Sequence, residues 1–417
     1  MGEGGRRSRW AGALSGVALP CLLMIGAAPA HADTIRDRQW YLDGMHAEEM
    51  WKASTGTGVT VAVVDTGVDD GLPDLRGQVL PGKDFLGSKR DGRTDTQGHG
   101  TLISVLIAGT GKGFGGTGAM GLAPGTKILP LRVMSNEGEW AAEKPAMVEA
   151  IRYAANSEAK IINISIGALG TSPELDRAVQ YAVSKGKLIF ASSGNEGQKG
   201  NPTLYPAAIP GVVAVSAIDK EARVTAESSR GRHVSLAAPG DDLVTSCLGG
   251  TGICRSHGTS GASALASASA ALLWSAHPGW TANQVLRVLI NTAGGPKSGA
   301  KRTDLIGYGV VRPRIALKDP GDPGPADTNP LTGAPSSGSA ARPVPRRPDT
   351  KPGSGSSAEP AGERAAQRDD GGGTDTAAWV LLGAGGVLVA GGAVAVPVAM
   401  ARRRRKTAAG ATPPGFG

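Results

Sequence analysis

The sequence predicts an α/β domain with three layers, in which helices cover both faces of a mostly parallel β-sheet. The first observation is a series of short apolar runs rich in valine and isoleucine. They lack a clean polar–apolar alternation, which is typical of strands buried on both faces. The second is that segments with helical spacing of apolar residues lie between these runs. The third is glycine, which supplies 64 of the 417 residues and indicates many tight turns.

The predicted elements alternate along the chain. Strands are predicted at residues 59–64, 127–133, 160–166, 187–191 and 212–217. Helices are predicted over residues 102–108, 146–156 and 173–185, and from Ser260 onward in an alanine-rich segment. Because ligands of parallel sheets gather at the carboxyl ends of the strands, the residues that follow the strands are the candidates for a functional site.

Residues 1–32 carry the features of a secretory signal peptide. Three arginines among the first nine residues form a basic region, and an apolar stretch follows over residues 11–28. Ala30 and Ala32 are the small residues that a signal peptidase requires. We therefore expect cleavage after Ala32 and export of the mature chain.

The C-terminal part is predicted to be a tether. Residues 319–376 are rich in glycine and proline and indicate a disordered linker. Residues 377–401 are apolar and uncharged and are long enough for one transmembrane helix, with a soluble apolar tail as the alternative. The basic tail, residues 402–417, then belongs in the cytoplasm. Residues 33–318 remain as one large domain on the outer side of the cell membrane.

Charge and cysteines narrow the function classes. The formal net charge of +8 gathers largely at the two chain ends, and no recognition motif accompanies it, so we expect no nucleic-acid partner. Cleavage of the signal peptide removes Cys21 and leaves Cys247 and Cys254 as a pair. Their spacing predicts a disulfide in an oxidising compartment, with two free buried thiols as the alternative.

Three residue types that carry chemistry occur at the ends of predicted elements. Asp65 ends the first strand, His99 lies between two glycines before a helix, and Ser260 begins the alanine-rich helix. A helix N-terminus favours negative charge and so assists a hydroxyl nucleophile. Each residue alone has a plain structural interpretation: a turn-forming aspartate, a surface histidine and a helix-capping serine. Together they match an Asp-His-Ser triad.

The chain order of these residues is that of the subtilisin triad. The blocks VVDTGVD, GHGT and GTSxA around them resemble the motifs of the subtilisin-like serine proteases, the subtilase family. Further blocks resemble family segments in the right order, and extend the resemblance over about residues 40–316: GLAPG at 121–125, NISIG at 163–167, ASSGNEG at 191–197 and AAPG at 237–240.

The resemblance implies a subtilisin-like fold and a serine endopeptidase that hydrolyses protein or peptide substrates without a cofactor. It implies that Ser260 attacks the scissile carbonyl, that His99 transfers the proton and that Asp65 orients the imidazole. Asn195 and the Ser260 amide would stabilise the oxyanion. The implied substrate-binding residues lie on two strand ends, one pairing with an extended peptide and one lining a roomy specificity pocket: Ser165, Ile166 and Gly167, and Ser192, Ser193 and Gly194.

The chain departs from the family pattern at several places. Ala264 stands where the family usually has proline, and residues 103–105 read Ile-Ser-Val where it usually has Val-Ala-Gly. No calcium loop is evident, because residues 110–118 lack carboxylates, although Asp74 remains a candidate ligand. No long prodomain is evident after Ala32.

A subtilase without a long prodomain, carrying a linker and a C-terminal anchor, resembles the mycosins, which are linked to type VII secretion. The resemblance therefore implies the type VII secretion machinery as a partner. A catalytically idle subtilase fold serving as a scaffold in a secretion complex is the alternative, and the intact Asp65, His99, Ser260 and Asn195 argue against it. A triad esterase is disfavoured because the serine lacks a Gly-x-Ser-x-Gly elbow.

Overall fold

The computed structural model describes residues 1–2, 34–87, 91–135 and 144–335. Within these residues the centre is a seven-stranded sheet with the order β2-β3-β1-β4-β6-β8-β9, in which every pair of neighbours is parallel. The strands are β1 (Thr60–Asp65), β2 (Lys83–Asp84), β3 (Lys127–Arg132), β4 (Ile161–Ile164), β6 (Leu188–Ser192), β8 (Val212–Ile218) and β9 (Val234–Pro239).

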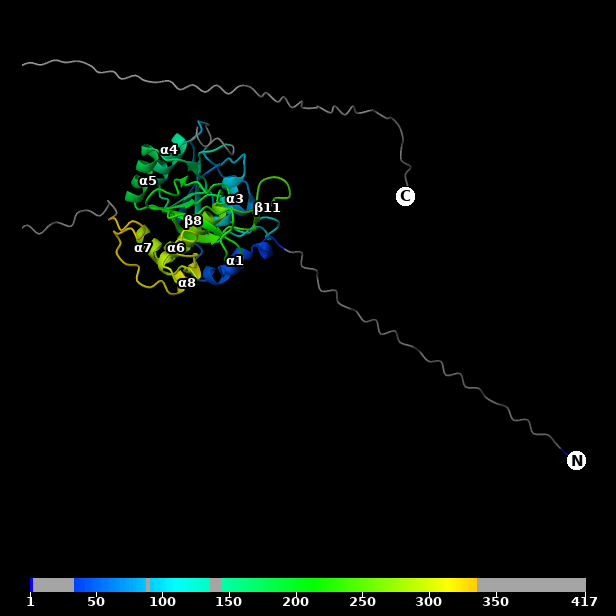
Figure 1. Cartoon of the computed structure of the whole chain (residues 1–417). Coiled ribbons are helices and arrows are strands. Elements are labelled where there is room, and N and C mark those ends of the chain that lie inside the picture. Colours follow the sequence, from blue (N-terminus) through cyan, green and yellow to red (C-terminus); the bar gives the residue numbers. More distant parts are fainter. Residues whose placement is uncertain (3–33, 88–90, 136–143, 336–417) are drawn as a thin grey trace, which may run out of the picture. The chain divides into compact units, whose positions relative to one another are not determined.

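Helices cover both faces of this sheet. One face packs against α4 (Lys144–Ala155) and α5 (Pro173–Ser184), and the other against α3 (His99–Ala108) and α6 (Thr259–Ala276). Figure 1 shows α4 and α5 on one side of the domain and α6 on the other. The predicted α/β fold with a mostly parallel sheet is confirmed. Shorter elements extend the α3–α6 layer: η1 (Arg36–Arg38), α1 (Trp40–Gly44), α2 (Ala47–Trp51), η2 (Pro73–Leu75), α7 (Ala282–Asn291) and α8 (Pro313–Lys318).

Two small antiparallel pairs lie outside the main sheet. β5 (Ala168–Leu169) pairs with β7 (Leu204–Tyr205), next to the end of β4. β10 (Leu243–Ser246) pairs with β11 (Ile253–Ser256), directly before α6. The disulfide of the structure joins Cys247 to Cys254 across this second hairpin, which agrees with the predicted pairing.

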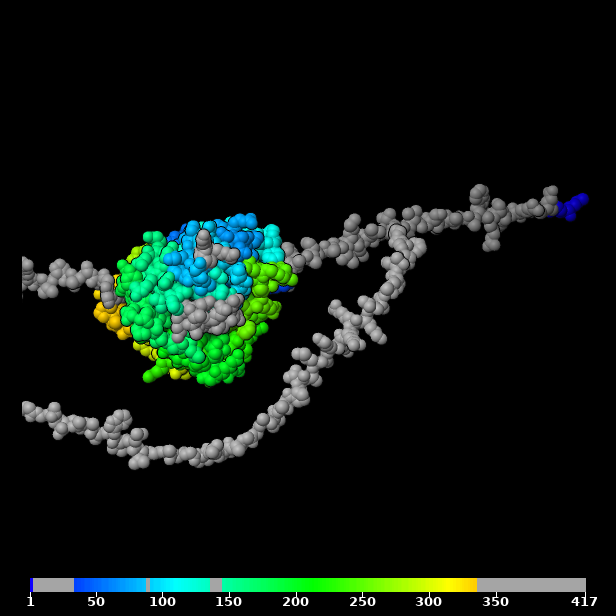
Figure 2. Space-filling model, turned by 90° about the horizontal axis from the view of Figure 1, so that it is seen from above, coloured from blue at the N-terminus to red at the C-terminus, as the bar shows by residue number. Residues whose placement is uncertain are grey.

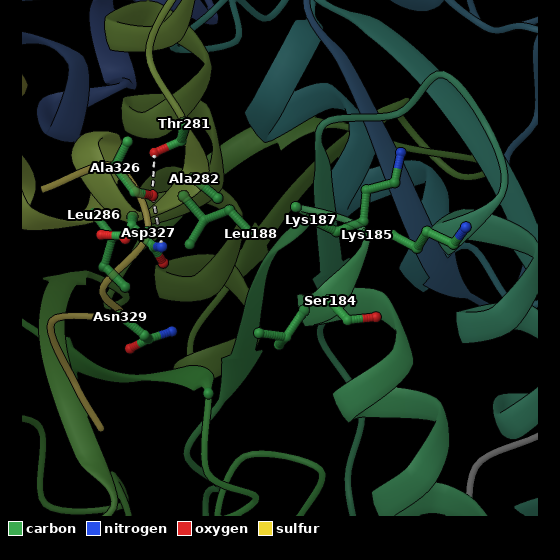
Figure 3. Close-up of a pocket in the computed structure, with 14 residues that line it drawn as sticks. Ser184, Lys185, Lys187, Leu188, Thr281, Ala282, Leu286, Ala326, Asp327 and Asn329 are labelled. Atoms are coloured by element: carbon green, nitrogen blue, oxygen red, sulfur yellow. Dashed lines mark hydrogen bonds between the residues drawn. The ribbon is translucent and has the colours of Figure 1, made fainter. Parts of the chain in front are cut away.

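The packed part of the chain continues beyond residue 318, where the sequence places the start of the linker. Residues 319–335 form a strap that crosses α7, and Figure 2 shows them among the packed atoms of the domain. The Arg287 guanidinium on α7 donates to three strap carbonyls at 2.6–2.8 Å. Thr281 and Asn283 both donate to the Ala326 carbonyl at 3.0 and 2.9 Å. Strap, α7 and the α5–β6 turn enclose a cavity of about 360 Å³, shown in Figure 3.

Several sequence predictions concern residues outside the described part. These are the signal peptide apart from its first two residues, the rest of the linker, the span at 377–401 and the basic tail. Among the residues that the structure does describe, no helix has both the length and the hydropathy needed to cross a bilayer.

Candidate active site

The candidate site begins at the carboxyl end of β1, in the middle of the sheet. Asp65 ends this strand with a fully buried carboxylate, and its Oδ1 lies 2.6 Å from Nδ1 of His99, at the start of α3. The same oxygen accepts the Thr66 amide at 2.8 Å. The strand and the helix come this close because residue 100 is glycine, since a methyl group there would collide with the Gly67 carbonyl. The buried carboxylate therefore holds one nitrogen of the imidazole in place.

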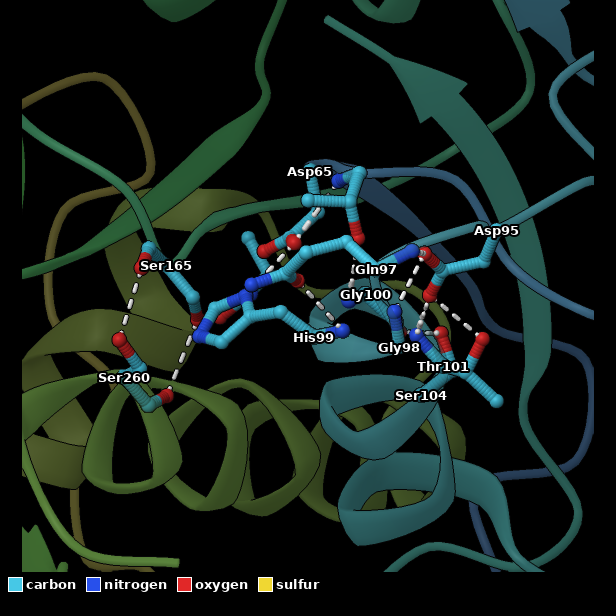
Figure 4. A network of polar contacts seen from close by, with 12 residues as sticks. Asp65, Asp95, Gln97, Gly98, His99, Gly100, Thr101, Ser104, Ser165 and Ser260 are labelled. Atoms are coloured by element: carbon cyan, nitrogen blue, oxygen red, sulfur yellow. Dashed lines mark hydrogen bonds and ion pairs between the residues drawn. The ribbon is translucent and has the colours of Figure 1, made fainter. Parts of the chain in front are cut away.

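Asp95 holds the start of α3. Its Oδ1 accepts the Gly98 amide at 2.7 Å, and its Oδ2 accepts both the amide and the hydroxyl of Thr101, at 2.9 and 2.7 Å (Figure 4). A carboxylate at a helix N-terminus satisfies amides that have no partner within the helix. Sequence reasoning missed Asp95. The available signal was an acidic residue four positions before His99.

Ser260 lies in the first turn of α6, facing the end of β4. Its hydroxyl donates to the Ser165 carbonyl at 2.8 Å, and the Ser165 hydroxyl donates to the Ser260 carbonyl at 3.0 Å. Figure 4 shows the His99 ring between Asp65 and Ser260. The structure thus brings Asp65, His99 and Ser260 together, although 195 residues separate the first from the last.

A buried asparagine fixes α6 against the sheet. Asn163 on β4 accepts the hydroxyls of Ser263 and Ser267 at 2.9 and 3.0 Å, and its Nδ2 donates to the Ser165 hydroxyl at 2.8 Å. All three side-chain partners come from the α6 face or the β4 end, so the network sets the position of the Ser260 turn relative to the Ser165 backbone.

Asn195 follows β6 and lines the same cavity as His99 and Ser260. Its Oδ1 accepts both the amide and the hydroxyl of Thr259, at 2.8 and 3.0 Å. The carboxamide oxygen is therefore held at the start of α6, which leaves Nδ2 as the donor that faces an incoming group.

His99, Asn195 and Ser260 line one cavity of about 380 Å³. Of the predicted substrate-binding residues, five line it: Ser165, Ile166, Gly167, Ser192 and Gly194. Ser193 does not, because its side chain is fully buried and donates to the Ser229 carbonyl at 3.1 Å.

His257 also lines the cavity. It lies 2.8–2.9 Å from both carboxylate oxygens of Glu227, and this hydrogen bond raises the pKa of His257 above its ordinary value.

Asp74, the one candidate calcium ligand that the sequence leaves open, is bound by protein donors. The buried Asp74 carboxylate accepts the Gly113 and Ala119 amides at 2.6 and 3.1 Å and the Ser246 hydroxyl at 2.6 Å. These three donors fill the space around both oxygens. Among the described residues, no group of three or more His, Cys, Asp or Glu side chains is arranged to hold a metal ion.

The departures from the family pattern leave both helices intact. Ala264 is fully buried in α6, which runs without interruption from Thr259 to Ala276. Ser104 is buried in α3 and donates to the Gly100 carbonyl one turn earlier at 2.8 Å. Neither residue displaces the helix start that carries His99 or Ser260.

The fold and site place the chain in the class of α/β proteins with an Asp-His-Ser constellation at the carboxyl edge of a parallel sheet. The family model of the Subtilase family (peptidase S8) matches residues 56–311, so the chain belongs to this family. The predicted family resemblance is confirmed.

Two bacterial serine proteases are similar to this chain in sequence, which agrees with the family assignment. A thermophilic serine proteinase of Bacillus sp. (strain AK1) is 37% identical over 205 residues, which are 49% of this chain and 49% of the relative. Subtilisin E of Bacillus subtilis (strain 168) is 33% identical over 241 residues, which are 57% of this chain and 61% of the relative. The chain thus spans about half to three fifths of the length of these two relatives.

Solved structures of mycosins match this chain over a larger share of its length. MycP1 from Mycobacterium smegmatis is 29% identical with a TM-score of 0.62, covering 71% of this chain and 88% of that one. The MycP3 protease from the type VII (ESX-3) secretion system is 30% identical with a TM-score of 0.58, covering 67% and 87%. The predicted resemblance to mycosins is confirmed.

Proposed function

We propose that the chain is a serine endopeptidase in which Ser260 is the nucleophile, His99 the general base and Asp65 the residue that orients His99. One observation carries the proposal: the 2.6 Å contact between His99 Nδ1 and buried Asp65, in a cavity that Ser260 and Asn195 also line. Because Asp65 engages Nδ1, Nε2 is the nitrogen that serves Ser260.

The geometry supports acyl transfer in two halves. In the first, the Ser260 hydroxyl exchanges the Ser165 carbonyl for His99 Nε2 and gives up its proton as Oγ bonds to the scissile carbon. The carbonyl oxygen becomes an oxyanion, to which Asn195 Nδ2 donates. The C–N bond then breaks, and the proton on His99 passes to the leaving amine. In the second half, water attacks the acyl-enzyme by the same path and releases Ser260.

A fluorophosphonate probe tests this assignment. We expect it to label the wild-type protein and to leave Ser260→Ala unlabelled. Ser275→Ala is the matched control, because Ser275 lies on the same helix but donates to the Thr57 carbonyl, away from the cavity. Labelling that persists in Ser260→Ala overturns the nucleophile assignment. A folded wild-type protein that takes no label favours the scaffold alternative.

We also propose that the peptidase domain, residues 33–318 together with the strap, is held outside the cell by the span at 377–401 and acts with type VII secretion machinery. The support is the signal-peptide pattern, the basic tail after the span, and the similarity to mycosins that come from type VII secretion systems. A C-terminal tag should resist external protease in intact cells. Digestion of the tag from outside the cell would contradict the proposed orientation.

We further propose that Cys247 and Cys254 are oxidised in the exported protein. A hairpin disulfide agrees with a chain that leaves the reducing cytoplasm. Non-reducing peptide mapping should link the two residues. Alkylation of both without prior reduction contradicts the pairing.

A further inference from the structure

The space predicted to be a roomy specificity pocket contains a leucine. Beyond β4 and β6 the chain runs through Gly167 and Gly194, and both glycines line the cavity. Since β4 and β6 are neighbours in the sheet, the gap between these two extensions is where a substrate side chain next to Ser260 would enter. Leu204 also lines the cavity, and it comes from a distant segment, β7.

The side chain of Leu204 reaches both edges of this gap. A Cβ atom placed on Gly167 would lie 3.4 Å from Leu204 Cβ and 3.6 Å from its Cδ1. A Cβ atom placed on Gly194 would lie 2.8 Å from the same Cδ1. One methyl group therefore sits against both glycines, so the volume that their missing side chains leave open is taken by Leu204.

The position of Leu204 is fixed by its strand. β7 pairs with β5 in a register that places Leu204 opposite Leu169 and Tyr205 opposite Ala168, directly after Gly167. At the other edge, Glu196 Oε2 accepts the Asn195 amide at 2.8 Å and lies close to Gly194. The paired backbone fixes the Leu204 Cβ beside the gap, and its Cδ1 lies against Gly194, so the pocket is shallow, with a carboxylate at its side.

We propose that Leu204 is the specificity-determining residue of this site and restricts cleavage to bonds that follow alanine, glycine or serine. This inference rests on the proposed peptidase function and names its substrate class. A larger side chain before the scissile bond would overlap the Leu204 methyl groups, whereas a side chain of one or two heavy atoms fits above them. Because the pocket acts on both ground and transition states, the discrimination should appear in kcat/KM.

Peptidyl diphenyl phosphonates that differ only in the residue preceding phosphorus test the proposal on the purified full-length protein. We expect the alanine probe to inactivate the wild-type protein at least about tenfold faster than the phenylalanine, leucine or lysine probes. Leu204→Ala should narrow that ratio by about tenfold or more by opening the gap. Leu169→Ala is the matched control, because Leu169 faces Leu204 across the strand pair but is 66% exposed and does not line the cavity.

The outcomes separate the two proposals. Equal inactivation of the wild-type protein by the alanine and phenylalanine probes, with fluorophosphonate labelling intact, overturns the role of Leu204 and leaves the peptidase proposal standing. Loss of fluorophosphonate labelling in the folded wild-type protein overturns the peptidase proposal itself. The wild-type comparison needs no variant. The proposal can therefore still be refuted if the Leu204→Ala protein does not fold.

Discussion

Asn195 illustrates how a single side chain is prepared for one task. Both hydrogen bonds from Thr259 end on Oδ1, so in the proposed mechanism the amide nitrogen is left as the donor to the oxyanion. Donors held in advance stabilise developing charge without reorganisation. The backbone of α6 therefore contributes twice, once through the Ser260 turn and once by aiming the neighbouring amide.

Asn195→Ala should lower turnover by about 100- to 1,000-fold, as the loss of such a donor does in subtilisin. Stability should also fall, because the buried Thr259 amide and hydroxyl lose their acceptor, so turnover is compared per folded protein. Steady-state hydrolysis of an alanine-containing peptide measures the effect, and Asn201→Ala, at another exposed turn bonded to Arg230, serves as the control. Full turnover in Asn195→Ala would remove this residue from the mechanism.

His257 should titrate above its ordinary pKa because Glu227 hydrogen-bonds and attracts its protonated ring. A raised pKa means that the ion pair is fully formed below the ordinary value and is lost as the pH rises through the raised one. NMR titration should show this, and Glu227→Gln should return the pKa toward normal. His277 is the internal control, because burial shifts its pKa in the opposite direction. An unchanged His257 titration in Glu227→Gln contradicts the pairing.

Candidate catalytic residues are easier to predict from sequence than the residues that shape the pocket around them. Asp65, His99, Ser260 and Asn195 lie in short local motifs; the last three line one cavity, and the buried Asp65 contacts His99. Leu204 lies in no such motif, and its effect depends on a strand pairing between distant segments. The small residues Ser192, Ser193 and Gly194 therefore predicted a roomy pocket, whereas Leu204 from another segment lies against Gly194.

At the level of elements, the link between β4 and α6 is polar where most of the surrounding core is apolar. Asn163, Ser263 and Ser267 are fully buried, and all hydrogen-bond through the one carboxamide. Such a network specifies position only while every member is satisfied, because an orphaned buried hydroxyl or amide is costly.

Asn163→Ala should lower the free energy of unfolding by about 1–3 kcal/mol, because it leaves buried hydroxyls without their acceptor. Ser269→Ala should have a much smaller effect, since Ser269 donates only to the Leu265 carbonyl of its own helix. Urea unfolding of the two variants measures the difference. Equal stability of both would mean that the network does not couple β4 to α6.

Asp74 ties the glycine-rich loop to β10 through protein donors alone. EDTA and added calcium should therefore both leave the thermal midpoint unchanged. Asp74→Ala should lower it by stranding the Gly113 and Ala119 amides and the Ser246 hydroxyl. Asp74→Asn keeps one acceptor oxygen and should therefore lower the thermal midpoint by less than Asp74→Ala does. A midpoint that rises with calcium would show that the carboxylate exchanges these donors for a metal.

Strands formed by long apolar runs are predicted well, and the short or small-residue strands are less well predicted. The runs that form β1, β3, β4, β6 and β8 lie within one to two residues of their predicted bounds. β9 is marked only by its end, the family-like AAPG block at 237–240, and β2 has only two residues, so neither forms a long apolar run. Their place in the sheet comes from pairing with neighbours, which a local pattern does not contain.

For the whole molecule, one arginine makes three of the contacts that dock the strap on α7. The sequence places the start of the linker at residue 319 because glycine and proline become frequent there. The strap nevertheless packs, since Arg287 binds three of its carbonyls. Arg287 binds backbone carbonyls of the strap. Because every residue type carries such a carbonyl, the strap sequence does not reveal the contact.

Arg287→Ala should therefore lower the free energy of unfolding by about 1–3 kcal/mol and expose the strap to protease. Arg177→Ala is the matched control, since Arg177 makes only an exposed ion pair with Glu174 and should change stability by less than about 1 kcal/mol. Limited proteolysis should cut the wild-type protein after residue 335 but cut Arg287→Ala within residues 319–335 as well. Cleavage of the wild-type protein at residue 319 would mean that the strap does not dock, and that the domain ends where glycine and proline first become frequent.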